Sequence, residues 1–297
     1  MASAGLRIIR RRIRSVQSTM KITSAMELIA ASRIVKAQAR VEAAQPYTDQ
    51  MRAVITNVGA AAGGTSHPLL ERREIRTPAV LAVTSDRGLA GAYSTNVIRL
   101  AEARLIELNN AGTPPRLYVV GKKAQTYFRY RGYQIEQAFL GVTDAPGYGD
   151  ARAIANTIMN DFAEASIDSL EAFTTRYLSA MTQTAVLWPL LPIEPPQPGD
   201  QASEGAELPK AGYNYEPSAE EILDRLLPRY VEASVFGILL EASASEHAAR
   251  RRAMKAATEN AEELTKILTR EANQARQAEI TTEISEIVGG AEALTQG

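Results

Sequence analysis

The chain has 297 residues, of which 45% are hydrophobic and 6% aromatic, and its formal net charge is −1. This length allows one large or two ordinary domains, and the absence of cysteine excludes disulfides, thiolate metal sites and cysteine catalysis. The two histidines, His67 and His247, are too few and too far apart for a zinc site or a histidine-based triad, so we expect no cofactor. No apolar run reaches the length of about 20 residues that crosses a bilayer, and a soluble or peripheral protein is expected.

The N-terminal stretch is predicted to be a long helix with one apolar seam. Nothing breaks the pattern before Pro46, where the helix should end or kink, and Tyr47–Val58 can continue as a further helical stretch. An arginine-rich start could also be a transit peptide, but the seam runs through it unbroken. The apolar seam residues recur at three- and four-residue steps, interrupted only by the polar steps Thr23 and Glu27: Leu6, Ile9, Ile13, Val16, Met20, Ala30, Ile34, Ala37, Val41 and Ala44.

The middle of the chain alternates short apolar runs with helical stretches, which predicts a parallel α/β sheet. Two further β-like runs close the domain, and the Pro- and Gly-rich stretch 193–217 is expected to be a return loop. The expected strands are 79–83, 117–120, 135–140, 173–178 and 186–191, and the expected helices are 93–109, 123–131 and 150–165 with Asp150 as the cap.

The C-terminal stretch is predicted to be a second long helix, starting from a capping box formed by Ser218 and Glu221. The run 238–288 alone would span roughly 75 Å at 1.5 Å per residue, so we expect it to extend beyond a compact globule and to need a partner. Its seam is rich in alanine, which favours a tight two-helix coil with the N-terminal helix: Met254, Ala257, Ala261, Leu264, Leu268, Ala275 and Ala278. The fold class is thus a long antiparallel coiled coil of the terminal helices with an inserted Rossmann-like α/β domain, divided at residues 1–58, 59–216 and 217–297.

The loop Ser85–Gly91 (SDRGLAG) follows the first expected strand, where an α/β fold usually binds a ligand. It lacks both the G-x-G-x-x-G spacing and the G-K-[ST] of a phosphate-binding loop, so a turn or a docking loop for another protein is favoured over nucleotide binding. Arg7–Arg14 is basic enough to suggest nucleic-acid contact, but apolar seam residues interleave the arginines, and stacking aromatics are absent before Tyr47.

Four segments together resemble the gamma subunit of the F-type ATP synthase, in the right order and over nearly the whole chain. They are 6–38 (LRIIRRRIRSVQSTMKITSAMELIAASRIVKAQ), 85–91 (SDRGLAG), 244–263 (ASEHAARRRAMKAATENAEE) and 280–293 (ITTEISEIVGGAEA).

The resemblance implies a non-catalytic rotor shaft whose terminal helices turn inside a hexamer of alternating alpha and beta subunits. The α/β domain would contact the epsilon subunit and the membrane ring of c subunits, with one copy per complex, no nucleic acid and no direct membrane insertion. It further implies a bacterial complex at the cytoplasmic side of the cell membrane, without thiol regulation. By position in the matching motifs, the contacts with the hexamer are Met26, Arg87, Leu89, Ala90, Arg250, Gln277, Thr281 and Glu283, although Ala90 replaces the cysteine common there.

Two other classes of function stay open at this point. A nucleotide-binding enzyme predicts ligand affinity at the loop 85–91, and a nucleic-acid-binding or adaptor coiled coil predicts salt-sensitive binding through Arg7–Arg14. Met26 can also be a residue of the coiled-coil core rather than a contact with the hexamer.

Overall fold

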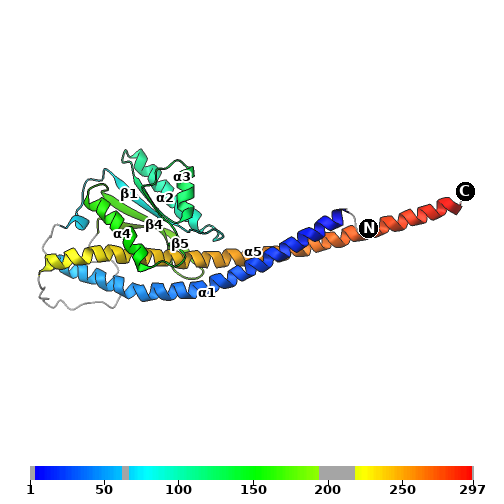
Figure 1. The fold of residues 1–297 in the computed structure, drawn as a ribbon, viewed down its shortest axis with the longest axis horizontal. Coiled ribbons are helices and arrows are strands. Elements are labelled where there is room, and N and C mark those ends of the chain that lie inside the picture. Colours follow the sequence, from blue (N-terminus) through cyan, green and yellow to red (C-terminus); the bar gives the residue numbers. More distant parts are fainter. Residues whose placement is uncertain (1–3, 62–66, 194–217, 296–297) are drawn as a thin grey trace. The chain divides into compact units, whose positions relative to one another are not determined.

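The computed structural model describes residues 4–61, 67–193 and 218–295. The chain divides into two compact units, one made of residues 1–30 with 250–297 and the other of residues 31–249. Two long helices, α1 (Ala4–Ala61) and α5 (Ala219–Thr295), contribute to both units (Figure 1). The expected return loop lies, from residue 194 on, outside the described residues.

Helix α1 continues through Pro46, so an end of the helix at this residue is wrong. The stretch after Pro46 buries Met51, Ile55 and Val58 in the larger unit, each less than one tenth exposed. Burying such a side chain stabilises by about 1.5–3 kcal/mol, and three of them outweigh the cost of about 3 kcal/mol for a proline inside a helix.

Helix α5 begins where the sequence predicts it. Ala219 is its first residue, and the Oγ of Ser218 accepts a hydrogen bond from the backbone N–H of Glu221 at 3.2 Å. This bond satisfies one of the free donors of the first helical turn.

In the unit made of residues 1–30 and 250–297, the two helical segments lie side by side and run in opposite directions (Figure 1). Thr23 and Thr258 join them by a hydrogen bond of 2.8 Å between their Oγ1 atoms. Leu6 and Ala30 on α1 are buried, as are Met254, Ala261 and Leu268 on α5, which confirms the two seams. Ala278 is exposed, however, and its place in the seam is wrong, because the buried face of α5 follows Ala272 and Ala275 instead.

The unit of residues 31–249 is built on a five-stranded sheet of order β3-β2-β1-β4-β5. Besides the long helices and the short 3-10 helix η1 (Pro68–Leu70), its elements are β1 (Pro78–Val83), α2 (Tyr93–Asn110), β2 (Arg116–Val120), α3 (Lys122–Tyr130), β3 (Gln137–Phe139), α4 (Tyr148–Ala163), β4 (Ser169–Tyr177) and β5 (Gln183–Leu191).

The first four strands of this sheet are parallel, whereas β5 pairs antiparallel with β4. The parallel pairing predicted for the strands that alternate with helices is confirmed, whereas the direction of the last strand was not predicted. Only residues 178–182 join β4 to β5, and such a short connection allows a hairpin but no crossover to a parallel strand.

Each face of the sheet carries its own apolar core. Helices α2 and α3 cover one face, where Val80 and Val119 meet Phe128. Helix α4 and the long helices cover the other, where Leu81 and Tyr118 meet Ile158 and Leu227 (Figure 1). The sheet is thus the middle layer of three, and the carboxyl ends of β1, β2 and β3 share one edge.

Candidate functional site: the loop at residues 85–91

The loop starts from two fully buried residues at the end of β1. Thr84 Oγ1 donates a hydrogen bond to the carbonyl of Val120 and accepts one from the N–H of Ala124, at 3.1 and 3.0 Å. Ser85 Oγ lies 2.7 Å from both Ser94 Oγ and the carbonyl of Arg87, to which it donates. These bonds attach the loop to α2 and α3.

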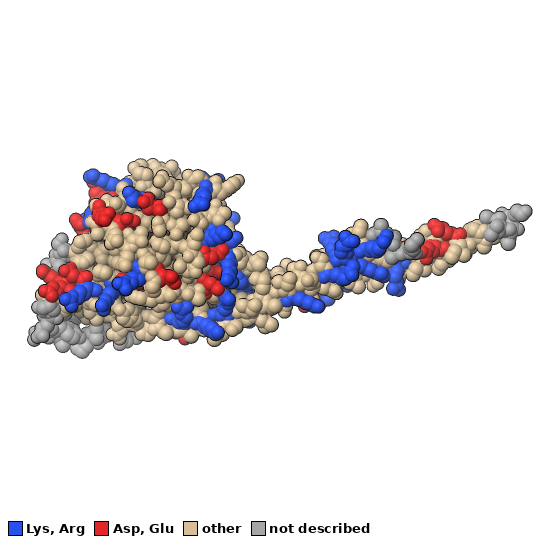
Figure 2. Space-filling view, viewed as in Figure 1, with Lys and Arg blue, Asp and Glu red and all other residues tan. Residues whose placement is uncertain are grey.

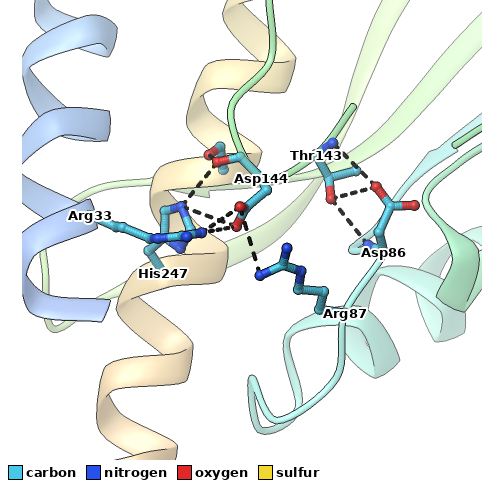
Figure 3. Close-up of polar contacts among 7 residues, drawn as sticks. Arg33, Asp86, Arg87, Thr143, Asp144 and His247 are labelled. Carbon is cyan, nitrogen blue, oxygen red and sulfur yellow. Dashed lines mark hydrogen bonds and ion pairs between the residues drawn. The ribbon is translucent and has the colours of Figure 1, made fainter. Parts of the chain in front are cut away.

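The carboxylate of Asp86 joins three loops at the carboxyl edge of the sheet, and Figure 3 shows its contact with Thr143. Its oxygens accept hydrogen bonds of 3.0 Å from the N–H groups of Lys122 and Gly141, and also from Thr143 Oγ1. The backbone N–H groups of Lys122 and Ala124 in the first turn of α3 are therefore occupied by Asp86 and Thr84 and are not free to bind an anion.

The middle of the loop faces solvent. The side chain of Arg87 is 67% exposed, and Leu89 is 61% exposed. Leu89 also has a φ of 64°, in the left-handed region that costs a residue with a Cβ about 1–2 kcal/mol. An exposed leucine in a strained backbone is typical of a binding residue. Ala90, by contrast, is buried, and only its neighbours can reach a partner with their side chains.

Asp144, in the loop between β3 and α4, is the acidic neighbour of Arg87. Its carboxylate accepts hydrogen bonds from Nη1 of Arg33 on α1, and its Oδ2 lies 3.9 Å from Nη1 of Arg87 (Figure 3). Its carbonyl accepts hydrogen bonds of 3.2 Å from Ser243 Oγ and His247 Nε2, both on α5. Burial raises the pKa of Asp144, but the hydrogen bond and charge of Arg33, with Arg87 and His247, outweigh it and hold the pKa below its ordinary value.

The other expected contact residues lie on the two long helices. Met26 is half-buried, so its side chain contributes to the seam and also reaches the surface; Arg250 is buried. Gln277, Thr281 and Glu283 are exposed, and Thr281 Oγ1 donates to the carbonyl of Gln277 at 2.9 Å. Arg250 and Gln277 are separated by about 40 Å of helix at 1.5 Å per residue. The eight residues thus form separate groups rather than one site.

Sequence reasoning missed Arg33, Thr143, Asp144 and His247. Arg33 lies on α1, Thr143 and Asp144 lie in the loop before α4, and His247 lies on α5. The bonds that Asp144 forms with Arg33 and His247 join residues 111 and 103 positions apart in the chain. Local spacing carries no signal for such contacts. Asp86, within the loop 85–91, carried one signal: a carboxylate three residues past a buried strand can cap the neighbouring helix.

Among its described residues, the smaller unit exposes more basic than acidic side chains. Figure 2 shows basic side chains gathered along its helical segments. The exposed basic residues there include Arg7, Arg10, Arg11, Arg12, Arg14, Lys21, Arg251, Arg252, Lys255, Lys266, Arg270 and Arg276. This surface suits an acidic partner.

Within the described ranges 4–61, 67–193 and 218–295, His, Asp and Glu do not form a group of three or more that could hold a metal ion. The same ranges contain no helix that is both long and apolar enough to cross a membrane.

The fold is similar to that of chains in three solved ATP synthase structures. The match to a chain of the Euglena gracilis mitochondrial enzyme (OSCP/F1/c-ring, rotational state 3) has a TM-score of 0.66 at 15% identity and covers 98% of this chain and 94% of that one. A chain of the Tetrahymena thermophila central stalk and c-ring gives 0.60 at 21% identity, covering 80% and 99%. These matches place the fold in the class found in ATP synthase rotors.

Sequence comparison gives the family. The family model described as ATP synthase matches residues 5–294. The ATP synthase gamma chain of Parafrankia sp. is 51% identical, covering 98% of both chains, and that of Streptomyces avermitilis is 47% identical, covering 98% of this chain and 96% of the relative. The chain belongs to the ATP synthase gamma chain family.

Proposed function

We propose that this chain is the central rotor shaft of a bacterial F-type ATP synthase and is itself non-catalytic. The observation that carries the proposal is the gamma chain match, which extends over 98% of the chain. The fold agrees with the proposal. Two antiparallel helices that pack through a seam rich in small apolar residues form a stiff rod rather than a ligand pocket.

The proposed partners are the alpha and beta subunits, the epsilon subunit and the c-subunit ring, with one shaft per complex. Two surface features of the smaller unit support an encircling hexamer: its exposed basic side chains, and exposed apolar residues that water disfavours. These apolar residues are Ile8, Ile22, Leu28, Ile29, Ile280, Ile284, Ile287 and Val288. The division at residues 1–58, 59–216 and 217–297 into shaft helix, foot domain and shaft helix is part of this proposal.

Rotation would couple proton flow to ATP synthesis through contacts that differ between the conformations of each beta subunit. Exposed Arg87 and Leu89 are the proposed contacts of the larger unit, with Ala90 supporting their loop. Met26, Arg250, Gln277, Thr281 and Glu283 are the proposed contacts of the smaller one. The complex would lie at the cytoplasmic side of the cell membrane.

The test is an affinity purification of the tagged chain from detergent-solubilised membranes of its host. We expect alpha and beta subunits in equal amounts, each in about threefold excess over the tagged chain, with ATPase activity that the chain alone lacks. Recovery of the chain alone, or with nucleic acid, would contradict the proposal.

A further inference from the structure

The segment 141–147, between β3 and α4, is attached to both long helices and to the loop 85–91. We call it the strap. Arg33 and Arg40 of α1 donate hydrogen bonds to the Asp144 carboxylate and to the Pro146 carbonyl. On the side of α5, Ser243 and His247 donate to the Asp144 carbonyl.

The strap is also the partner of the exposed loop. Asp86 accepts hydrogen bonds from the N–H of Gly141 and from Thr143, whose Oγ1 in turn accepts one of 3.1 Å from the N–H of Asp86. Arg87 faces the Asp144 carboxylate, as Figure 3 shows. One residue, Asp144, therefore contacts the loop, α1 and α5 at once.

The geometry points to Asp144 as a positioning residue that fixes the loop 85–91 to both long helices. The apolar core on this side of the sheet also holds these elements together, but apolar packing is non-directional. Charge-assisted hydrogen bonds fix orientation as well as distance. A force that a partner applies to Arg87 or Leu89 is then transmitted through Asp144 to α1 and α5, and the loop keeps its orientation. This inference rests on the proposed rotor function.

The test uses the assembled complex in membrane vesicles, with ATP-driven proton pumping divided by the rate of ATP hydrolysis as the readout. Asp144→Asn removes the charge but keeps an acceptor and all the carbonyl contacts. We expect the subunit composition to stay unchanged and the pumping-to-hydrolysis ratio to fall at least about threefold, because the hydrogen bond from Arg33 loses its charge assistance and the ion pair with Arg87 is lost. Asp144→Glu, which keeps the charge, should recover most of the ratio.

Glu171→Gln is the matched control. Arg104 on α2 forms a two-bond ion pair with Glu171 on β4, at 2.7 and 2.8 Å, and the side chains are 29% and 22% exposed. This pair resembles Arg33–Asp144 in chemistry and burial but joins α2 to the sheet rather than to the long helices. The ratio should be unchanged in this variant.

A normal ratio in Asp144→Asn, or an equal fall in Glu171→Gln, would overturn the positioning role. If Asp144→Asn does not assemble, Arg33→Gln tests the same hydrogen bond from the donor side. The side chain of Arg33 is 41% exposed, and we expect the pumping-to-hydrolysis ratio of this variant to fall by at least about threefold. A wild-type chain that brings down no alpha and beta subunits would overturn the rotor function itself, before any variant is compared.

Discussion

At the scale of single residues, Leu89 is an exposed residue with a strained backbone conformation. Leu89 combines a left-handed backbone with a side chain turned to solvent. Neither property improves folding, and the proposed contact with a partner subunit would account for both. The neighbouring Ala90 is buried and supports the loop from beneath.

Leu89→Gly should separate folding from function. Glycine adopts the left-handed region without a Cβ penalty, so the free energy of unfolding should stay equal or rise by up to about 1 kcal/mol. The ratio of pumping to hydrolysis in the assembled complex should fall, because the contact is lost. Urea denaturation and vesicle assays measure the two effects; a loss of stability with normal coupling would show that Leu89 serves only the fold.

Glu241 gives a prediction about pH. Burial raises the pKa of this carboxyl, and the hydrogen bond from the N–H of Tyr177 and the charge of Arg176 offset this only in part. Because the folded state binds the proton more tightly than the unfolded state, the group lowers stability as the pH rises above the unfolded pKa of about 4.3. The full cost is present above the folded-state pKa.

Glu241→Gln removes this cost and keeps an oxygen that can accept from Tyr177. We expect a higher free energy of unfolding than wild type at pH 7 and a difference that shrinks as the pH falls toward 4. Urea titrations at both pH values measure it. Glu271, exposed in the interior of the same helix, is the control, since Glu271→Gln should change neither value; a gain for Glu241→Gln that persists unchanged at pH 4 would contradict the linkage.

At the scale of elements, one glycine sets the approach of a strand to a helix. Gly121, between β2 and α3, has a φ of 91°, and a Cβ built there would lie 2.5 Å from the carbonyl oxygen of Thr84. Backbone atoms cannot move aside without disturbing β1 and the loop that follows it.

Gly121→Ala should therefore cost about 2–5 kcal/mol, the sum of a left-handed backbone and a steric clash. Gly112 is the matched control: its φ is 79°, but nothing lies within 4 Å of the built Cβ. Gly112→Ala should cost only about 1–2 kcal/mol. Thermal or urea unfolding of both variants measures the difference, and equal costs would show that the close approach to Thr84 is unimportant.

The two-helix seam gives a prediction for its alanines. Ala261 is 8% exposed within the seam, and a leucine there would overpack it at a cost of about 1–3 kcal/mol. Ala278 is exposed on the same helix, so Ala278→Leu should change stability by less than about 0.5 kcal/mol. Thermal unfolding of the two variants distinguishes a close-packed seam from a loose one, in which both leucines would be tolerated.

At the scale of the whole molecule, function depends on how force passes between the chain and its neighbours. Arg87→Ala should lower the ratio of proton pumping to ATP hydrolysis while the complex still assembles, because the exposed guanidinium is lost and the buried framework of the loop stays. Arg129, exposed on α3 away from the loop, is the control, and Arg129→Ala should leave the ratio unchanged. Normal pumping with Arg87→Ala would show that the loop 85–91 is only a turn and not a contact with a partner.

Much of this architecture could be predicted, because local patterns of apolar and polar residues determine it. Helix α2 was expected over 93–109 and extends from Tyr93 to Asn110, and the run 79–83 lies within β1. The antiparallel edge strand could also have been found, since the connection between the last two β-like runs is too short for a crossover. Pro46 misled because its local cost is outweighed by burial that only the tertiary structure reveals.

The polar network of the site could not be predicted in this way. Asp144 meets Arg33 and His247 only because α1, α5 and the strap are folded together. None of these residues has a motif or a spacing that points to the others. The seam alanines could be predicted in part. Their spacing predicted that the two helices pair, but the point where the pairing ends, before Ala278, depends on the length of the partner helix.

The last described turns of α5 have a consequence for the life of the chain before assembly. From Ile280 to Ala291 every side chain is exposed, including four large apolar ones. Such a helix end has little to hold it folded and much that adheres to other exposed apolar surfaces. A chain made in excess of its partners should therefore be trimmed from this end by proteases or aggregate, so that its abundance in the cell follows the supply of the subunits that cover it.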